Sequence, residues 1–423
     1  MRKFTFKGGV HLEENKLTKD EPIKKLDYPS LFVIPLLQHI GKPAKPVVNK
    51  NDKVLRFQII AEKEGMISAN IHSPVSGKVI DIKKYITCSG EKVESIFIEN
   101  DGEYKSFEYE KIDPQKVNSK KLLERIAEAG IVGLGGACFP THVKLSPPHK
   151  IDTFIVNACE CEPYLTVDHR LLLERTDELI EGIEIVLKIL NIKKAIIGIE
   201  DNKIDAYEKL SEKLPKNIEI ALLKTKYPQG GEKQLIKAIL DREVPPGGVP
   251  YEVGVVVHNV GTVLAIRDAV YEGKTLVERV FTASGYVRKA GNYIAPIGMK
   301  LKDIISQLGG IPEFINKIVI GGPMMGVAIS SLEVPFTKSV TGILFLENLK
   351  KEEYECIRCS RCVDICPMNL LPTEIYRKVK KKDYINLKNL YPEDCIECGS
   401  CSYVCPSKIE LIQYIKLAKI LAK

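Results

Sequence analysis

The sequence predicts a multidomain protein that combines α/β and α+β units. Its 423 residues exceed the length that one hydrophobic core usually organises. Short apolar runs broken by Gly, Pro and Ser fill residues 57–109 and predict small antiparallel strands. Helical and strand-like segments alternate over residues 119–257, which predicts a mostly parallel sheet covered by helices. A third pattern is the clustering of cysteines: eight of the twelve lie in the segment from Cys356 onward.

Composition and charge exclude several broad classes. Apolar residues make up 44% and charged residues 28% of the chain, as in globular proteins, so large disordered or fibrous regions are not expected. The net charge of +7 is modest, and the basic run Arg377–Lys382 is expected to be a solvated helical face. We therefore expect no nucleic-acid partner. Residues Met1–Val10 lack the apolar core of a secretory signal, and no stretch of about 18 apolar residues predicts a membrane-spanning helix.

The first predicted unit, residues 1–115, is a β-rich, barrel-sandwich-like domain. Its turns in HSPVSGKV and SGEKV resemble those of biotinyl and lipoyl domains. Those carriers need a modified lysine flanked by methionines or acids at a hairpin tip, and Lys63, Lys78 and Lys83 lack such a setting. We therefore expect a docking domain without a swinging arm.

The second predicted unit, residues 116–275, is an α/β domain. Helices are expected at 119–130, 177–190, 204–214 and 232–240, and strands at 154–158, 195–199, 218–223 and 253–257. A glycine-rich loop, GLGGACFPT at Gly133–Thr141, lies between the first helix and the first strand. It is not the Rossmann fingerprint, which would need glycine at Cys138 and the order strand, loop, helix. Taken alone, the loop is either a phosphate- or cofactor-binding loop or an ordinary tight turn.

Two further units complete the chain. Residues 276–348 are expected to form a small α+β domain, with strands in VFTASGYV and IVIGGPMMG and a short helix at Lys302–Leu308. Residues 349–423 hold the clustered cysteines and close with a helix, for which Ser407 and Glu410 have the spacing of a capping box. That helix is expected to pack on the cysteine-rich domain; the alternative is that its apolar face meets a membrane or a partner.

The clustered cysteines form one motif twice. Each copy reads C-x2-C-x2-C-x3-C-P, so each ends at a proline, Pro367 or Pro406. Three closely spaced thiolates can wrap three irons of a cubane, and the fourth, one residue further on, ligates the other cluster. The sequence therefore predicts two [4Fe–4S] clusters, one held by Cys356, Cys359, Cys362 and Cys405 and the other by Cys395, Cys398, Cys401 and Cys366. Zinc also accepts thiolate pairs, but a zinc site does not require the C-x3-C-P arm twice.

Four segments, in order, resemble the FMN- and NADH-binding motifs of the flavoprotein subunit of respiratory complex I. They are GLGGACFPTHVK, NACECEP at Asn157–Pro163, YPQGGE at Tyr227–Glu232 and HNVGT at His258–Thr262. FKGGVHLEENK at Phe6–Lys16 precedes them, and a soluble-ligand-binding β-grasp (SLBB) unit and a ferredoxin-like twin-cluster domain follow. Throughout its length the chain is similar to the C-subunit family of Rnf electron-transport complexes.

This resemblance implies a site for non-covalently bound FMN. Gly133, Gly135 and Gly136 would let backbone N–H groups approach the isoalloxazine and the phosphate without a side-chain clash. Lys144 matches the family lysine and would pair with the phosphate. An isoalloxazine needs several fixed donors and acceptors, and the residues implied for them are Asn157, Asn259 and Thr262.

The resemblance also implies an NADH site beside the flavin, where Phe139 would stack on the nicotinamide or the adenine. Carboxylates there can accept from ribose hydroxyls and disfavour the extra phosphate of NADPH. The carboxylates implied are Glu160, Glu162 and Glu232, and Tyr227 and Gly230 of YPQGGE complete the implied cofactor-binding set. Each of these residues also has an ordinary alternative role that involves no cofactor: Phe139 as a core aromatic, and the glutamates as solvated acids.

The chain departs from the complex I pattern at two positions. Leu134 stands where the flavoprotein has arginine, and Cys159 stands where it has an acid, so individual FMN contacts are expected to differ. Cys159 belongs with Cys88, Cys138 and Cys161, the four cysteines outside the motifs. They contain no C-x2-C pair, and we expect small buried side chains rather than a third cluster.

The expected function is that of an NADH:ferredoxin oxidoreductase subunit. NADH would reduce FMN, and the two clusters would pass electrons to membrane-embedded partner subunits that couple transfer between NADH and ferredoxin to ion movement. The chain itself would be peripheral, on the cytoplasmic face of a bacterial cell membrane. The alternatives are a soluble reductase with the same chemistry, such as a cobalamin reductase or a proline-reductase electron-transfer protein, and an electron carrier without flavin.

Overall fold

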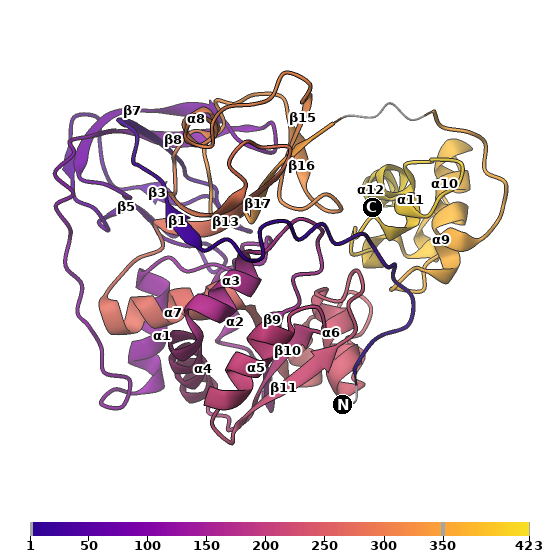
Figure 1. Ribbon diagram of the computed structural model, residues 1–423, viewed down its shortest axis with the longest axis horizontal. Helices are drawn as coiled ribbons and strands as arrows, with labels where there is room; N and C mark the ends of the chain where they lie inside the picture. The colour runs from indigo at the N-terminus through magenta and orange to yellow at the C-terminus, as the bar shows by residue number, and fades with distance from the viewer. Residues whose placement is uncertain (1–2, 348–351, 423) are drawn as a thin grey trace.

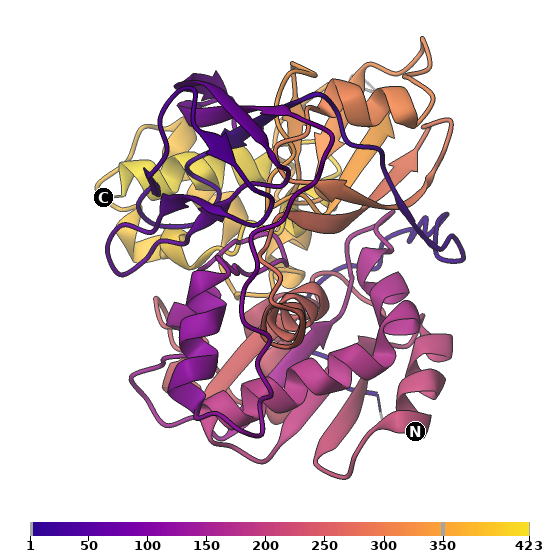
Figure 2. The same cartoon turned by 90° about the vertical axis from the view of Figure 1, so that its left-hand side faces the viewer.

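The computed structural model describes residues 3–347 and 352–422 of the chain. An α/β part lies beneath two β-rich parts, and a small helical part at the C-terminal end stands to one side (Figure 1). The α/β part still lies below the β-rich parts after a quarter turn (Figure 2). The predicted combination of α/β and α+β architecture is confirmed.

The first β-rich part, within residues 31–100, consists of two small antiparallel sheets with the strand orders β2-β8-β7-β4 and β3-β5-β6. The strands are β2 (Leu31–Pro35), β3 (Lys45–Pro46), β4 (Lys53–Val54), β5 (Ile59–Glu62), β6 (Ile71–His72), β7 (Gly77–Ile86) and β8 (Lys92–Asn100). Gly90, in the turn between β7 and β8, has a φ of +84°, a conformation that suits glycine. The antiparallel pairing confirms the prediction for this region.

The second β-rich part has one sheet with the order β1-β14-β13-β17-β15-β16. Its elements are β1 (Ile23–Lys25), β13 (Glu278–Gly285), β14 (Gly291–Pro296), α8 (Leu301–Gln307), β15 (Lys317–Ile320), β16 (Val327–Ile329) and β17 (Gly342–Leu346). Phe32 and Ile34 of the first part and Phe281, Phe336 and Phe345 of the second belong to one continuous hydrophobic cluster. The two β-rich parts therefore share a single core.

The α/β part has a four-stranded, fully parallel sheet with the order β11-β10-β9-β12. Its strands are β9 (Thr153–Ala158), β10 (Ala195–Glu200), β11 (Ile218–Leu223) and β12 (Val255–Asn259). Its helices are α1 (Ser119–Glu128), α2 (Thr141–Lys144), α3 (Val167–Glu174), α4 (Thr176–Leu190), α5 (Ile204–Lys213), α6 (Glu232–Leu240), η1 (Pro250–Val253) and α7 (Val260–Glu272). Side chains alternate along β9, so Phe154 and Val156 join the core with α4 and α7, whereas Ile155 packs with Leu235 of α6. The predicted parallel sheet with helices on its faces is confirmed.

The helical part consists of α9 (Arg361–Asp364), α10 (Pro372–Lys380), η2 (Lys388–Leu390), η3 (Pro392–Asp394), α11 (Ser400–Tyr403) and α12 (Leu411–Leu421). Leu411 and Ile415 of α12 pack in its core, which confirms the expected packing of the closing helix. The predicted capping box is wrong. The helix begins at Leu411, and the Ser407 hydroxyl donates to the Glu355 carbonyl, 2.8 Å away, so it holds the preceding loop instead. Among the described residues, no helix is long and apolar enough to cross a bilayer.

The first residues of the chain form an extended arm. Phe4 pairs with Leu223 at the edge of the α/β sheet, and Val10 pairs with Tyr227. The arm then reaches the second β-rich part, where β1 pairs with β14 in parallel. Residues 3–25 therefore lie along the α/β part and the β1-containing sheet.

Candidate functional site

The site predicted for the cofactor lies at the carboxyl edge of the parallel sheet. The chain runs from β9 through β10 to β11 on one side and returns to β12 on the other, so the strand order reverses between β9 and β12. Ligands of open α/β sheets bind at such a switch point. Two predicted residues, Asn157 and Asn259, form the last residue pair between β9 and β12 and lie opposite each other in register.

The glycine-rich loop covers this edge. The Leu134 N–H donates to the Thr262 hydroxyl, 2.8 Å away, at the start of α7. A side chain at Gly135 would place its Cβ 3.4 Å from the Cβ of Asn259, so the loop passes close over the end of β12. The loop is closed on itself by hydrogen bonds between Gly133 and Phe139 (2.8 Å) and between Cys138 and Gly133 (3.1 Å).

The tip of this loop presents free backbone donors. Gly135, Gly136 and Ala137 are exposed, and none of their N–H groups donates to an acceptor in residues 3–347 or 352–422. Gly136 has a φ of +107°, and a Cβ there would point into open space. Successive backbone N–H groups without acceptors can donate to an anion, and this chemistry fits the phosphate or the ring carbonyls of FMN.

Lys144 and Glu232 meet beside the loop. The Lys144 ammonium, at the end of α2, donates to the Glu232 carboxylate, at the first position of α6. Both side chains remain partly exposed, at 25% and 37%. The structure thus joins the lysine expected for the phosphate to an acid expected for the dinucleotide.

The side chains of the two asparagines hold the backbone around the site. Asn157 donates to the Gly230 carbonyl, 2.8 Å away, and so ties β9 to the YPQGGE segment. Asn259 accepts from the Gly261 N–H (2.8 Å), which caps α7, and donates to Asp168 (2.6 Å). Burial, followed by the nearby Glu160 charge, raises the pKa of Asp168 to about 7. Asp168 was not predicted from the sequence, because it belongs to no motif and reaches the site only through the fold.

The acids of NACECEP are engaged within the protein. Glu160 accepts the N–H of Asp168 (2.9 Å) and therefore stabilises the start of α3. Glu162 accepts the N–H groups of Met324 (3.0 Å) and Met325 (2.8 Å) in the loop between β15 and β16, so it fastens the second β-rich part to the site. Burial raises the pKa of Glu162 to about 7.

A lysine of the N-terminal arm holds this same segment. The Lys16 ammonium donates to three carbonyls, those of Glu160 (2.6 Å), Glu162 (2.9 Å) and Leu165 (2.7 Å). Burial lowers the pKa of Lys16. In the sequence Lys16 is only the last letter of FKGGVHLEENK, and nothing in the local pattern shows that its partners lie about 145 residues away.

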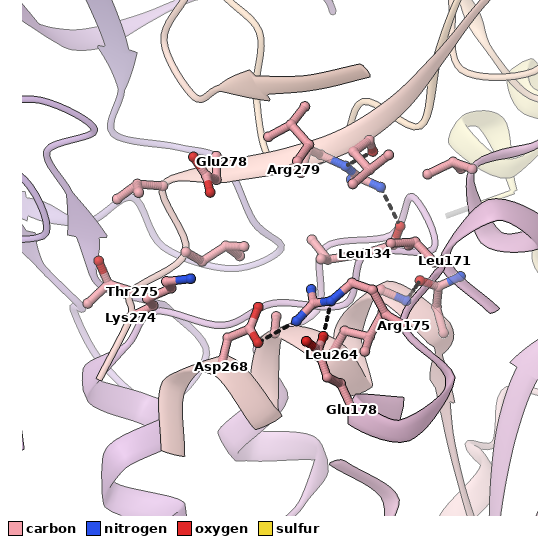
Figure 3. A pocket seen from close by; sticks show the side chains of 18 of the residues that line it. Leu134, Leu171, Arg175, Glu178, Leu264, Asp268, Lys274, Thr275, Glu278 and Arg279 are labelled. Atoms are coloured by element: carbon pink, nitrogen blue, oxygen red, sulfur yellow. Dashed lines mark hydrogen bonds and ion pairs between the residues drawn. The ribbon is translucent and has the colours of Figure 1, made fainter. Parts of the chain in front are cut away.

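A cavity of about 350 Å³ lies between α7 and β13. Figure 3 shows side chains that line it. Arg175 lies in it and pairs with Asp268, 2.6 Å away, and Arg279 reaches from β13 to the Leu134 carbonyl, 2.8 Å away. Of the predicted cofactor residues described by the structure, only Asn259 lines this cavity. The other predicted residues lie outside this cavity.

The eight motif cysteines gather as two groups of four, each around its own small hollow. The first group is Cys356, Cys359, Cys362 and Cys405. The second group is Cys366, Cys395, Cys398 and Cys401. Each group thus combines three cysteines of one motif with the last cysteine of the other, the arrangement expected for crossed ligation of two cubanes. The two motifs also share their backbone path, because Arg358 (φ 57°) and Glu397 (φ 59°) occupy equivalent left-handed positions.

The second cysteine group lies against the rest of the protein. The Tyr227 hydroxyl donates to the Cys398 carbonyl, 2.8 Å away, and the Gly9 N–H donates to the Ile365 carbonyl, also 2.8 Å away. In the first group, by contrast, Cys359 is exposed. The two groups therefore differ in position, one at the α/β part and one at the surface.

Four domain families match the chain in consecutive segments. An RnfC barrel sandwich hybrid domain matches residues 4–103, and a Nuo51 FMN-binding domain matches residues 126–268. An SLBB domain matches residues 280–328, and a 4Fe-4S dicluster domain matches residues 355–409. These families cover the regions that contain the switch-point site and both cysteine groups.

Curated relatives match over nearly the whole chain. The C-subunit of a proton-translocating ferredoxin:NAD(+) oxidoreductase complex from Clostridium ljungdahlii is 46% identical, over 98% of this chain and 93% of the relative. The C-subunit of a Na(+)-translocating ferredoxin:NAD(+) oxidoreductase complex from Acetobacterium woodii is 40% identical, over 98% and 96%. The C-subunit of an ion-translocating oxidoreductase complex from Rhodobacter capsulatus is 39% identical, over 90% and 76%.

A solved structure supports the fold. A chain of an NAD+-reducing [NiFe]-hydrogenase in the air-oxidized state has a TM-score of 0.50 and 18% identity, covering 72% of this chain and 62% of that one. At that identity the likeness concerns architecture alone. The full-length matches at 39% to 46% identity go further, and they show that this chain belongs to the RnfC family, the C-subunits of ion-translocating oxidoreductase complexes.

Proposed function

We propose that this chain is the NADH-oxidising, peripheral subunit of an Rnf-type complex and that it passes electrons between NAD(H), FMN and two [4Fe–4S] clusters. The observation that carries the proposal is the placement, in one chain, of an FMN-type switch-point site and two crossed groups of four cysteines joined through Tyr227 and Cys398. Membership of the RnfC family supports this function over that of a soluble reductase.

The chemistry requires both kinds of centre. Oxidation of one NADH to NAD+ releases two electrons and one proton, whereas each cluster accepts one electron. When bound, FMN supplies the exchange between two-electron and one-electron transfer. The two cysteine groups would hold two clusters, so the pair would account for both electrons, and the proton would leave to solvent.

The chain's own residues would bind and orient the flavin. The N–H groups of Gly135, Gly136 and Ala137 would donate to the ligand, and Lys144 would turn from Glu232 toward the phosphate. Glu232 would then be free to accept a ribose hydroxyl of the dinucleotide, and its charge would disfavour NADPH.

The position of the two cysteine groups suggests an order of transfer. The group of Cys366, Cys395, Cys398 and Cys401, next to Tyr227, would receive electrons first. The group of Cys356, Cys359, Cys362 and Cys405, with Cys359 exposed, would pass them to partners. We propose that those partners are membrane-embedded Rnf-type subunits and, through them, ferredoxin, and that the chain lies on the cytoplasmic face of the cell membrane.

One anaerobic experiment tests the proposal. The purified chain is assayed for iron and flavin, then mixed with NADH while flavin and cluster absorbance are followed. We expect about eight irons per chain for two cubanes, bound or acquired FMN, and bleaching of both chromophores. Absence of FMN binding would reject the dehydrogenase function, and a matched addition of NADPH should reduce the flavin more slowly. Co-purification with membrane subunits then distinguishes an Rnf-type subunit from a soluble reductase.

A further inference from the structure

We propose that the Tyr227 hydroxyl is a positioning group that fixes the Cys398 loop against the α/β part and thereby sets the rate of electron transfer into the second cysteine group. The proposal rests on the proposed function, because it concerns transfer from a flavin at the switch point to a cluster held by Cys366, Cys395, Cys398 and Cys401. It assigns to Tyr227 a task other than direct contact with the flavin.

The contact is buried and well defined. The Tyr227 side chain is 2% exposed, and its hydroxyl donates to the Cys398 carbonyl over 2.8 Å. The ring packs in a small hydrophobic cluster that contains Val10 and Cys398. A phenolic donor and a backbone carbonyl in such a setting have no water to replace either partner, so the bond is worth more than an exposed one.

The backbone of Tyr227 is itself held on both sides. Its N–H donates to the Val10 carbonyl (2.9 Å), and its carbonyl accepts from the Val10 N–H (2.7 Å). Three residues later, Gly230 accepts from Asn157 (2.8 Å), and a Cβ at Gly230 would lie 2.3 Å from the Cys159 carbonyl. The hydroxyl therefore extends from a rigid segment whose other end is tied to the switch-point residue Asn157.

This arrangement makes a short, continuous connection between the two redox sites. It runs from Asn157 through the hydrogen bond to Gly230, along the backbone to Tyr227, and through the hydroxyl to Cys398. Cys398 is one of the four cysteines of the second group. The path ends at a predicted ligand of the cluster expected nearest the α/β part.

Other contacts keep the helical part attached when the hydroxyl is removed. Gln234 of α6 donates to Met368 (3.1 Å), and the Gly247 N–H donates to Asp394 (2.9 Å). The Gly9 N–H donates to the Ile365 carbonyl (2.8 Å). Tyr227→Phe therefore changes the position of one loop within an interface that remains closed, and the phenyl ring preserves the packing.

The expected effect is a change in transfer rate. Without the hydroxyl, the Cys398 carbonyl loses its donor, and a buried hydrogen bond of this kind corresponds to about a tenfold change in the equilibrium constant between the correctly seated loop and displaced loops. We expect the rate of cluster reduction, divided by the rate of flavin reduction in the same single-turnover reaction with NADH, to fall by up to about tenfold.

The experiment uses the full chain with reconstituted clusters and FMN. The matched control is Tyr293→Phe, because Tyr293 is another buried tyrosine whose hydroxyl donates to a backbone carbonyl, that of Lys289, 2.9 Å away in the second β-rich part. Iron and flavin content are measured for each variant. A wild-type rate ratio in Tyr227→Phe with full iron and flavin overturns the proposal, as does an equal fall in Tyr293→Phe.

A second measurement applies if Tyr227→Phe does not retain its clusters. Hydrogen exchange of residues 395–401 is compared between wild type and variant, both without iron. Faster exchange confined to this segment supports the positioning role, and unchanged exchange overturns it. The proposed function fails separately, when the wild-type chain itself binds no FMN or its clusters are not reduced by NADH.

Discussion

Lys144 and Glu232 form an ion pair although they are 88 residues apart in sequence. Lys144 ends the short helix that follows the glycine-rich loop, and Glu232 begins α6 beyond the YPQGGE segment. Two segments that the sequence presents as separate motifs thus meet through opposite charges at one edge of the sheet. The pair closes the side of the site at which a phosphate and a ribose are both expected.

Lys144→Met should weaken FMN binding. A charge-assisted hydrogen bond to phosphate is worth about 1.5–3 kcal/mol, so the Kd for FMN should rise about tenfold to a hundredfold. Quenching of flavin fluorescence measures the Kd. The exposed neighbour Lys150, substituted as Lys150→Met, is the matched control and should leave the Kd unchanged. Equal affinities for wild type and Lys144→Met would show that Lys144 does not contact the phosphate.

Pairs of cysteine substitutions can test the crossed ligation. Cys356→Ala combined with Cys405→Ala removes two ligands from one predicted cluster, so about four irons should remain on the other. Cys395→Ala combined with Cys405→Ala damages both predicted clusters, so little iron should remain. Iron analysis and EPR spectra of the reduced proteins distinguish the two results. If the first variant lost nearly all its iron and the second kept about four irons, each motif would hold its own cluster. Cys88→Ala, outside the motifs, is the control.

Lys16→Met should destabilise the folded chain. The substitution leaves the carbonyls of Glu160, Glu162 and Leu165 without their shared donor. Removal of a buried charge offsets part of this loss, and we expect a net cost of about 2–4 kcal/mol. Thermal or denaturant unfolding measures it, with the exposed Lys19→Met as control. A stability within about 0.5 kcal/mol of wild type would show that water can replace the ammonium.

Glu162 should make stability depend on pH. Burial raises its pKa from the ordinary value of 4.5 to about 7, so the folded chain binds this proton more tightly than the unfolded chain does. The contribution of Glu162 is therefore most favourable below about pH 4.5 and is lost as the pH rises toward about 7. Glu162→Gln stays neutral. Its stability relative to wild type should increase between about pH 5 and about pH 8 in unfolding experiments.

The exposed Glu13→Gln variant serves as the control for this pH series. Its stability relative to wild type should stay constant over the same range. A Glu162→Gln variant that likewise shows no change with pH would mean that the carboxylate is already charged in the folded chain and fully stabilised by the N–H groups of Met324 and Met325.

Local patterns were sufficient where the chemistry is local. The repeated cysteine spacing predicted which four cysteines gather in each group, although ligation itself stays a prediction. The alternation of helices and strands predicted a mostly parallel sheet covered by helices, and the structure has a parallel sheet with helices packed on both faces. In both cases the information lies within a few residues, because a tight loop and a strand are each defined by neighbours in sequence.

The predicted capping box shows where local spacing is not sufficient. Ser407 and Glu410 have the required spacing, but Ser407 finds a better partner in the Glu355 carbonyl, about fifty residues earlier in the chain. A serine side chain can form a hydrogen bond with either a helix end or a distant loop. Tertiary packing determines which partner it takes, and the local sequence spacing carries no information about that packing.

By itself, the sequence determined the class of each part, the two cysteine motifs and the four segments that resemble flavin and dinucleotide motifs. Only the tertiary structure decided how these parts act on one another. The carboxylates of Glu160 and Glu162 face backbone N–H groups of other segments, and Lys16 fastens the arm to their loop. Tyr227, in turn, reaches the Cys398 loop. The physical reason is that buried polar groups must find partners, and those partners are chosen by the closeness of distant segments after folding.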